Sequence, residues 1–245
     1  MKLQHYQLTS CGDREINQDY MLHHVRNDYA LFVVADGLGG HHAGEKAAKY
    51  FCQGLLALVP EYRPKMLLNP QITMSSWVDA AIDKMAESFS GDSNINDAHT
   101  TCAILYIQKE FVVIAHCGDS RVYRLSQNGS LWRTKDHSMT QDLLEKGQIT
   151  EQQMGIHPDQ NILTRSINCS KSHQTEVNVY TPAEKGETFI ICSDGFWEYT
   201  KKNEFQQLAT FAVEKKGLLK QAQLAMIRAN GKSDNVTVQW LRIVA

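Results

Sequence analysis

Four aspartates lie where runs of apolar residues end, and carboxylates in such places can hold a metal ion. They are Asp36 after Leu31–Ala35, Asp119 after the run that begins at Ile114, Asp194 after Ile190-Ile-Cys-Ser, and Asp234 just before Val236-Thr-Val. One aspartate at a strand end is ordinary, because its short side chain suits turns and helix caps. Four weaken that explanation, since carboxylates that met at the strand ends would repel one another unless cations neutralised them.

The residue types narrow the identity of such a cation. Converging carboxylates form an all-oxygen ligand set, which suits a hard ion such as Mg²⁺ or Mn²⁺. The six cysteines are scattered, and no pair has the short spacing of a zinc site or a redox motif. We therefore disfavour zinc, expect the cysteines to be core thiols, and predict that Asp36 is a metal ligand.

Glycines accompany two of these aspartates. Gly37 and Gly195 each follow one directly, and a residue without a Cβ lets another group approach the backbone closely. We interpret that group as a backbone carbonyl, an ion or a phosphate. The stretch from Asp36 to His42 lacks the Gly-Lys-Ser/Thr ending of a P-loop and has a histidine where the dinucleotide fingerprint needs its last glycine. Both nucleotide-binding motifs are therefore poor matches.

Basic residues near these acids could take part in phosphate chemistry. Arg14 begins the run Arg14-Glu-Ile-Asn-Gln-Asp19, and a planar guanidinium beside metal ions is a natural clamp for phosphate. His41 and His42 could assist proton transfer. Taken alone, each of the three would more often be an exposed surface residue.

The elements that must position these residues can be predicted from the apolar pattern. Runs of β-branched and aromatic residues predict strands at Leu31–Ala35, Phe111–Cys117, Thr188–Cys192 and Val236–Trp240. Helical spacing of apolar residues predicts amphipathic helices over 47–58, 78–89 and 218–229. Within 100–125 the strand-like runs are separated by interruptions too short for crossover helices, so we predict largely antiparallel sheets.

A short helix and an irregular segment are predicted next. Ser138-Met-Thr-Gln141 has the form of a capping box and predicts a helix through Leu144. The pattern then weakens over residues 146–161, where Gly147, Gly155 and Pro158 break it. We predict a mobile surface excursion there and call residues 146–161 the flap segment.

Composition limits the class of protein. The 245 residues are 42% hydrophobic and 21% charged, which is typical of a soluble globular protein, and no break in composition marks a boundary within residues 1–245. We predict a single domain and a monomer. The formal charge of −2 argues against nucleic acid as a partner. No apolar run resembles a signal peptide or could span a bilayer, so we predict a cytoplasmic protein without membrane association.

Short segments in chain order together resemble the motifs of the PPM family, the metal-dependent protein serine/threonine (type 2C) phosphatases, and especially its compact bacterial members. The segments are Arg14-Glu-Ile-Asn-Gln-Asp19, Val34-Ala-Asp-Gly-Leu-Gly-Gly-His41 with Gly44-Glu45, Thr100-Thr101, Gly118-Asp-Ser-Arg121, Asp136-His-Ser138, Leu163-Thr-Arg165, Ser193-Asp-Gly195 and Ser233-Asp-Asn235. They span nearly the whole chain. An ordered series is far more specific than any one motif.

The resemblance implies an α+β fold, a four-layer αββα sandwich in which helices flank two central antiparallel β-sheets. It places a binuclear site for Mn²⁺ or Mg²⁺ at one edge of the sandwich. By motif, Asp36 would bridge the two ions and the Gly37 carbonyl would ligate one of them. Asp194 and Asp234 would ligate the other ion.

The resemblance also implies roles for residues around this pair of ions. Asp19 would act through metal-bound water, Asp119 would hold a third, weaker ion, and Arg14 would bind the substrate phosphate. Leu38 departs from the family pattern because animal relatives have a histidine there, proposed as the general acid. Gln18 stands where many members have glutamate, which removes one negative ligand.

The implied activity is hydrolysis of phosphoserine and phosphothreonine in proteins by direct attack of a metal-bridging hydroxide. Phosphorylated proteins and a cognate bacterial serine/threonine kinase, which the enzyme would oppose, are the implied partners. One alternative is a pseudophosphatase that keeps the fold as a binding module, against which the intact Asp36, Asp194 and Asp234 argue. The other is a hydrolase of small phosphate esters, which the same metal chemistry would serve.

Overall fold

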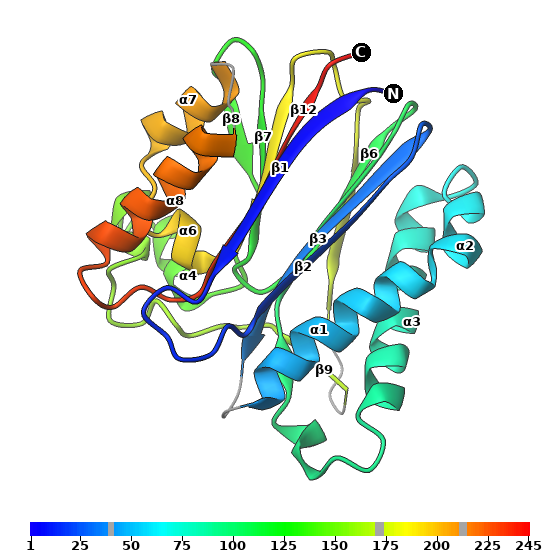
Figure 1. Cartoon of the computed structure of the whole chain (residues 1–245), viewed down its shortest axis with the longest axis horizontal. Coiled ribbons are helices and arrows are strands. Elements are labelled where there is room, and N and C mark those ends of the chain that lie inside the picture. Colours follow the sequence, from blue (N-terminus) through cyan, green and yellow to red (C-terminus); the bar gives the residue numbers. More distant parts are fainter. Residues whose placement is uncertain (39–41, 170–173, 211–214) are drawn as a thin grey trace.

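Two antiparallel sheets pack face to face, and helices cover the outer face of each (Figure 1). This arrangement is seen in a computed structural model, which describes residues 1–38, 42–169, 174–210 and 215–245. The layers are helix, sheet, sheet and helix, so the predicted four-layer αββα sandwich is confirmed.

The first sheet joins the two ends of the described chain. Its strand order is β1 (Leu3–Ser10), β12 (Val236–Ile243), β11 (Thr188–Cys192), β7 (Arg121–Leu125) and β8 (Leu131–Arg133). All of its pairings are antiparallel, and β1 pairs with β12 from Leu3 opposite Ile243 to Ser10 opposite Val236. This register brings the loop after β1 beside the loop before β12.

The second sheet contains the long central strand that carries Asp36. Its strand order is β10 (Glu176–Tyr180), β6 (Val112–Cys117), β5 (Cys102–Gln108), β3 (Tyr29–Leu38), β4 (His99–Thr100) and β9 (Ile167–Asn168), with β2 (Asp19–Val25) also paired to β3. Here too every pairing is antiparallel. In the β2–β3 pair, Asp19 lies directly opposite Asp36.

Two long helices, α1 (His42–Ala57) and α3 (Pro70–Ser88), cover the outer face of the second sheet (Figure 1). The helices α6 (Asp194–Trp197), α7 (Lys202–Thr210) and α8 (Lys215–Arg228) lie on the outer face of the first sheet. The shorter elements are α2 (Val59–Tyr62), η1 (Arg63–Lys65), η2 (Ser93–Asn96), α4 (Met139–Glu145) and α5 (Glu151–Met154).

Three apolar clusters hold the layers together. Between the sheets, residues such as Phe32 and Leu105 of one sheet meet Phe189 and Leu241 of the other. The other two clusters lie between each sheet and its helices. Buried apolar area contributes roughly 25 cal/mol per Å², so these interfaces are the main source of stability.

The predicted strands and helices are present, and two details differ from the prediction. Cys117-Gly-Asp119 does not join paired strands, because the chain leaves β6 of the second sheet there and enters β7 of the first. Gly118 makes this turn with a φ of 95°, and a Cβ on it would lie 2.6 Å from Cγ2 of Thr101. The flap segment is not purely irregular, since it contains the single turn of α5.

Ser138 is the predicted N-cap of α4, because its side chain accepts a hydrogen bond from the backbone N–H of Gln141.

His41 lies outside the described residues, and His42 is the first residue of α1. Among the residues that are described, no helix is long and apolar enough to cross a membrane.

Candidate metal centre

The predicted aspartates come from both sheets and lie together at one end of the sandwich. Asp36 is on β3, and Asp119 follows β6 at the point where the chain changes sheets. Asp194 begins α6 directly after β11, and Asp234 precedes β12. Each is therefore held at the end of a strand whose other residues are anchored in the core.

These four aspartates line one open pocket of about 440 Å³. The predicted residues Arg14 and Gly37 also line it, as does Leu38. Gln18 and residues to which the sequence assigned no role complete the wall: Glu15, Ile16, Asn161, Leu163 and Asn235. Asp19 lies behind the wall, where it is only 6% exposed.

Buried hydroxyl groups lie behind the pocket and bind the segments that carry the acids. The backbone N–H of Asp36 donates to Oγ1 of Thr101 at 3.0 Å, and that oxygen lies 2.7 Å from Oγ of Ser120, beside Asp119. Ser193 donates its hydroxyl to Oδ2 of Asp19 at 2.6 Å. Buried hydrogen bonds thus link the chain segments that carry the acids of both sheets, which keeps these segments rigid.

Asn235 holds the loop that carries Arg14. Its Nδ2 donates to the backbone carbonyls of Cys11 and Ile16, both at 2.9 Å, and its Oδ1 accepts the backbone N–H of Gln18 at 2.8 Å. This asparagine belongs to the Ser233-Asp-Asn235 motif, but only the aspartate of that motif was predicted to have a role. A side chain that binds backbone groups of a distant loop has no local sequence signal.

The glycines beside Asp36 and Asp194 are required by backbone packing. A Cβ on Gly37 would lie 2.2 Å from the carbonyl oxygen of Gly44, at the start of α1. A Cβ on Gly195 would lie 2.4 Å from the carbonyl oxygen of Asn235. Part of the predicted close approach is therefore between backbone segments of the protein itself, which draws α1 and α6 tightly against the pocket.

Burial and mutual repulsion destabilise the charged forms of the clustered acids. Burial raises the pKa of Asp36 well above its usual value, and Asp194 and Asp19 raise it further. The same causes, burial first, raise the pKa of Asp19 to about 8 and that of Asp194 to about 7. Asp119 also has a raised pKa, from burial and then from Asp194.

A fifth acid, Glu198, belongs to this electrostatic group and was not predicted from the sequence. Burial raises its pKa to about 9, with Asp194 and Asp119 contributing next. It follows Trp197 of α6, so its position depends on a helical turn that an apolar pattern of four residues cannot reveal.

The donor set fits divalent cations. Oδ1 of Asp19 is buried without a hydrogen-bond partner among the described residues, an orphaned oxygen of the kind that a metal ion or its water satisfies. Every other side-chain ligand predicted here is also a carboxylate, which suits Mg²⁺ and Mn²⁺. A bound cation would offset the repulsion that adds to burial in raising these pKa values.

Arg14 places its guanidinium beside this centre. Its Nη2 lies 2.8 Å from Oδ2 of Asp234, and the side chain is 59% exposed. The hydrogen bond to Asp234 and its negative charge raise the pKa of Arg14. The exposed side chain can therefore turn toward a ligand in the pocket.

The tightest group of metal-ligand atoms among the described residues lies elsewhere, at His116, His137 and Glu176. Their donor atoms are within 4.8 Å of one another, although the two histidines were not predicted to meet. Nδ1 of His137 accepts the backbone N–H of Gly118 at 3.2 Å, so the neutral ring carries its proton on Nε2, 3.6 Å from the Glu176 carboxylate. We interpret His137 as a support for the turn before Asp119 rather than as a ligand.

Comparison with known proteins assigns the architecture to a family. The sequence profile of the family described as protein phosphatase 2C matches residues 10–226. The chain belongs to this family, and with it to the metal-dependent protein serine/threonine phosphatases.

Individual relatives agree with this assignment. The serine/threonine phosphatase stp of Listeria welshimeri is 28% identical over 219 residues, covering 87% of this chain and 84% of that protein. A serine/threonine phosphatase from Streptococcus agalactiae of known structure is 27% identical, with a TM-score of 0.84 and coverage of 99% of this chain and 100% of that one.

A third relative was solved with metal. It is the catalytic domain of the serine/threonine phosphatase PstP in complex with two manganese ions; it is 23% identical, has a TM-score of 0.79 and covers 99% of both chains. At this identity the likeness shows a shared fold.

Proposed function

We propose that this enzyme hydrolyses phosphoserine and phosphothreonine in proteins, using two divalent cations, Mn²⁺ or Mg²⁺, and opposing a bacterial serine/threonine kinase. The observation that carries the proposal is the set of carboxylates, from both sheets, that line one open pocket beside Arg14. The manganese complex of PstP supports a binuclear centre.

The proposed ligands are those that the resemblance implies. Asp36 would be shared by both ions, the Gly37 carbonyl would bind one, and Asp194 and Asp234 would bind the other. Asp19 would act through bound water. Two ions held by these residues would supply an activated water and would stabilise negative charge at phosphorus.

Residues around the ions would bind and orient the substrate. Arg14 would exchange its contact with Asp234 for two hydrogen bonds to the phosphoryl oxygens, which its exposed position allows. Leu38 lines the pocket without a proton to give, so the leaving oxygen would take its proton from water or a carboxyl group. Asp119 would hold a third, weaker ion.

A protein substrate is supported by the rim of the pocket. Asn161 and Leu163 of the described chain line the pocket, and Ile162 between them is 48% exposed. An exposed apolar side chain beside an open pocket can contact residues that flank a phosphoserine. A small phosphate ester has no such residues to offer.

The proposal is tested by measuring phosphate release from phosphoserine and phosphothreonine peptides with Mn²⁺, with Mg²⁺ and after chelation by EDTA. p-Nitrophenyl phosphate serves as the small ester. We expect metal-dependent release from the peptides. Release from the small ester alone would identify a small-ester hydrolase, and release from neither would identify a binding module.

A further inference from the structure

A second cavity, of about 760 Å³, shares no lining residue with the metal pocket. Residues of β7, α5, α6, α7 and α8 line it, and none of the predicted metal ligands does. Its volume falls within the roughly 300–1,000 Å³ that is usual for small-molecule sites. The proposed phosphatase reaction makes no use of it.

Aromatic side chains form much of its wall. Tyr123, Trp197 and Phe205 line the cavity, and the rings of Tyr123 and Phe205 are stacked with centroids 4.1 Å apart. These three rings are almost completely buried, and Arg121 covers one face of Trp197, so they present apolar edges rather than open faces to the cavity. Such a wall favours a ligand with an apolar part.

The cavity favours a negative charge. Lys201 and Lys202 are exposed at the cavity, and within the described ranges neither makes an ion pair. The other charged groups are mostly neutralised: Arg121 by Asp136, Arg228 by Glu204, and Glu151 by Arg133. Glu198 is the one lining acid that no described basic side chain pairs with, so the two lysines outnumber it.

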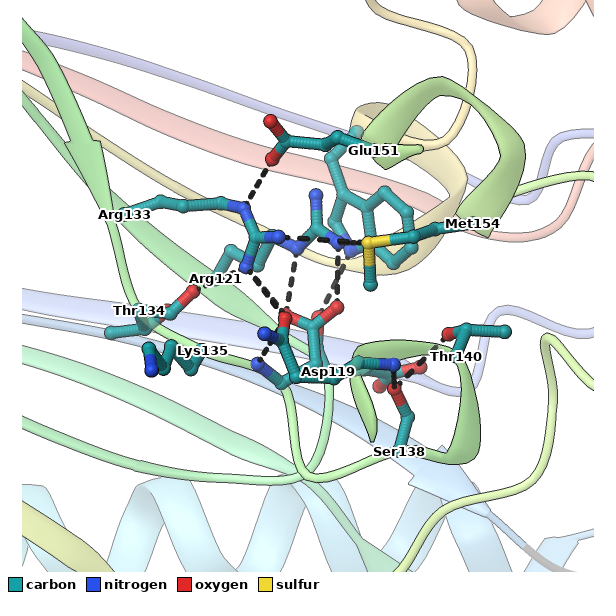
Figure 2. Close-up of polar contacts among 12 residues, drawn as sticks. Asp119, Arg121, Arg133, Thr134, Lys135, Ser138, Thr140, Glu151 and Met154 are labelled. Carbon is teal, nitrogen blue, oxygen red and sulfur yellow. Dashed lines mark hydrogen bonds and ion pairs between the residues drawn. The ribbon is translucent and has the colours of Figure 1, made fainter. Parts of the chain in front are cut away.

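The back wall of the cavity also supports the metal pocket. Nε1–H of Trp197 donates to the backbone carbonyl of Asp119 at 2.9 Å. Cζ of Arg121 lies 3.3 Å from the centroid of the Trp197 ring. Figure 2 shows Arg121 beside Met154 and close to Asp119, so the cavity wall and the turn that carries Asp119 form one contact network.

The flap segment is bound to the same network through α5. Arg133 contacts Glu151 of α5, and the sulfur of Met154 lies 3.7 Å from Nη2 of Arg121 (Figure 2). A molecule placed against Trp197 and Glu151 would therefore contact both α5 and α6, and α6 begins with Asp194.

We propose that this second cavity is a binding site for a small planar organic anion, and that the bound anion alters how Asp119 is held. The apolar part of the ligand lies against the accessible edges of Tyr123, Trp197 and Phe205, and its anionic group lies at Lys201 and Lys202. A ring with an anionic group is found in both nucleotides and aromatic carboxylates, so the experiment includes one probe of each kind.

The probes are adenosine 3′,5′-cyclic monophosphate, whose diester is not a phosphomonoester substrate, and 4-hydroxybenzoate. Binding to the full chain is measured by saturation-transfer NMR and calorimetry with Mn²⁺ present. Excess inorganic phosphate is added to occupy the metal pocket at Arg14. We expect at least one probe to bind. Binding should weaken about tenfold or more in K201A/K202A, because charge-assisted hydrogen bonds are lost.

A matched control carries the same loss of charge. Lys215 and Lys216 are also adjacent and exposed, but they lie outside the cavity, so K215A/K216A should bind the probe as the wild type does. Phe205→Leu keeps an apolar side chain of similar size but removes a ring, and it should also weaken binding. Failure of both probes to bind, or equal weakening in both lysine variants, would overturn the site.

The link to Asp119 has its own readout. Calorimetric titration with Mn²⁺ should give a dissociation constant for the weakest ion that changes about fivefold or more when the probe is bound. Linkage requires Mn²⁺ to change the affinity for the probe by the same factor. An unchanged constant in a protein that does bind the probe would overturn the proposed effect on Asp119.

Discussion

Asp36 illustrates how a functional residue can oppose stability. It is partly buried among other acids, and burial and repulsion raise its pKa, so the folded protein without metal holds its charged form at a cost. Asp36→Asn removes the charge with little change in shape. We expect activity to fall by about 100-fold or more, because a ligand of both proposed ions is weakened.

The Asp36→Asn variant should also differ from the wild type in thermal stability. Without metal, the variant should unfold at the same temperature as the wild type or a higher one. Mn²⁺ should raise the unfolding temperature of the wild type, since it binds the folded state, and should raise that of the variant much less. Asp28→Asn, at an exposed carboxylate in the turn before β3, is the control and should behave as the wild type. An undiminished response to Mn²⁺ in the Asp36 variant would exclude Asp36 as a ligand.

Arg14 should act on substrate affinity. Hydrogen bonds from a charged donor contribute about 1.5–3 kcal/mol, so Arg14→Ala should raise KM roughly 10- to 100-fold with a smaller change in kcat. Arg14→Lys keeps the charge without the paired hydrogen-bond geometry, so its KM should lie between those of the wild type and of Arg14→Ala. Steady-state kinetics on a phosphopeptide measures both constants. A collapse of kcat at constant KM would contradict a role in binding.

At the scale of elements, the close packing of β3 against the start of α1 depends on Gly37. A Cβ there would lie 2.2 Å from the carbonyl oxygen of Gly44, so Gly37→Ala must separate β3 from the start of α1. We expect a loss of about 3 kcal/mol, at the upper end for overpacking, together with loss of activity. Gly129→Ala, with a φ of 82° but open space around it, should destabilise less and keep activity. Chemical denaturation gives both values, and the opposite ranking would contradict the packing argument.

Specificity belongs to the flap segment. Ile162 follows it directly, is exposed and stands between the pocket-lining residues Asn161 and Leu163, whereas Met154 within it is buried against the arginines. Ile162→Ser should therefore lower kcat/KM for phosphopeptides with apolar flanking residues about tenfold, the effect of losing one apolar contact. Hydrolysis of p-nitrophenyl phosphate should hardly change. Val179→Ser, at an apolar residue that is 41% exposed away from the pocket, is the control.

Shortening the flap segment tests its role in substrate preference more directly. A variant trimmed within 146–161 that keeps Glu151 and Met154 retains the contacts of α5 with β7 and β8. We predict that it loses preference among phosphoproteins more than it loses hydrolysis of the small ester. Equal losses on both substrates across a Mn²⁺ titration would show that the flap segment does not determine specificity.

Local sequence patterns predicted most of the helices and strands. The features that they did not predict depend on contacts between residues distant in the sequence. Runs such as Thr188–Cys192 are buried on both faces, so composition alone identifies them as strands. β9 has two residues and pairs only with β4, which leaves no periodicity to detect. The change of sheet at Gly118 depends on its fit against Thr101, a residue that sequence spacing does not connect to it.

The candidate site was also predictable only in part. Aspartates at strand ends are visible in the sequence, and the order of the motifs linked them to a family. Asn235, Ser193 and Glu198 act through hydrogen bonds or charge across separate elements, and such partners are defined only once the sheets pack. His116 and His137 are separated by a hairpin-like excursion through β7 and β8, so their stacking was likewise hidden.

At the scale of the whole molecule, the two sheets meet along an edge that contains a pair of histidines. His5 of β1 and His23 of β2 have ring centroids 4.8 Å apart, and both lie near Phe32 in the apolar layer between the sheets. Burial lowers the pKa of each, and repulsion from His5 and His24 lowers that of His23 further. Protonation would place two like charges across the interface.

The sign of the effect on stability follows from these shifts. A histidine whose pKa is lower in the folded state binds protons more readily when the chain unfolds. The pair therefore leaves stability intact above the unfolded pKa of about 6.5 and reduces it as the pH falls below that value. The acids of the metal pocket act in the opposite direction in metal-free protein, because their folded pKa values are raised.

Saturating Mn²⁺ and a double variant separate the two contributions. We expect the unfolding temperature of the wild type in excess Mn²⁺ to fall between pH 7 and pH 5.5, and to fall less steeply in H5Q/H23Q, whose side chains do not titrate. Because both proteins retain the same acidic pocket, their difference isolates the histidines. The variant loses ring packing against Phe32, so it should start from a lower unfolding temperature at pH 8. Only the slope with pH tests the charge effect, and parallel slopes for the two proteins would show that the histidine pair does not couple the contact between the sheets to pH.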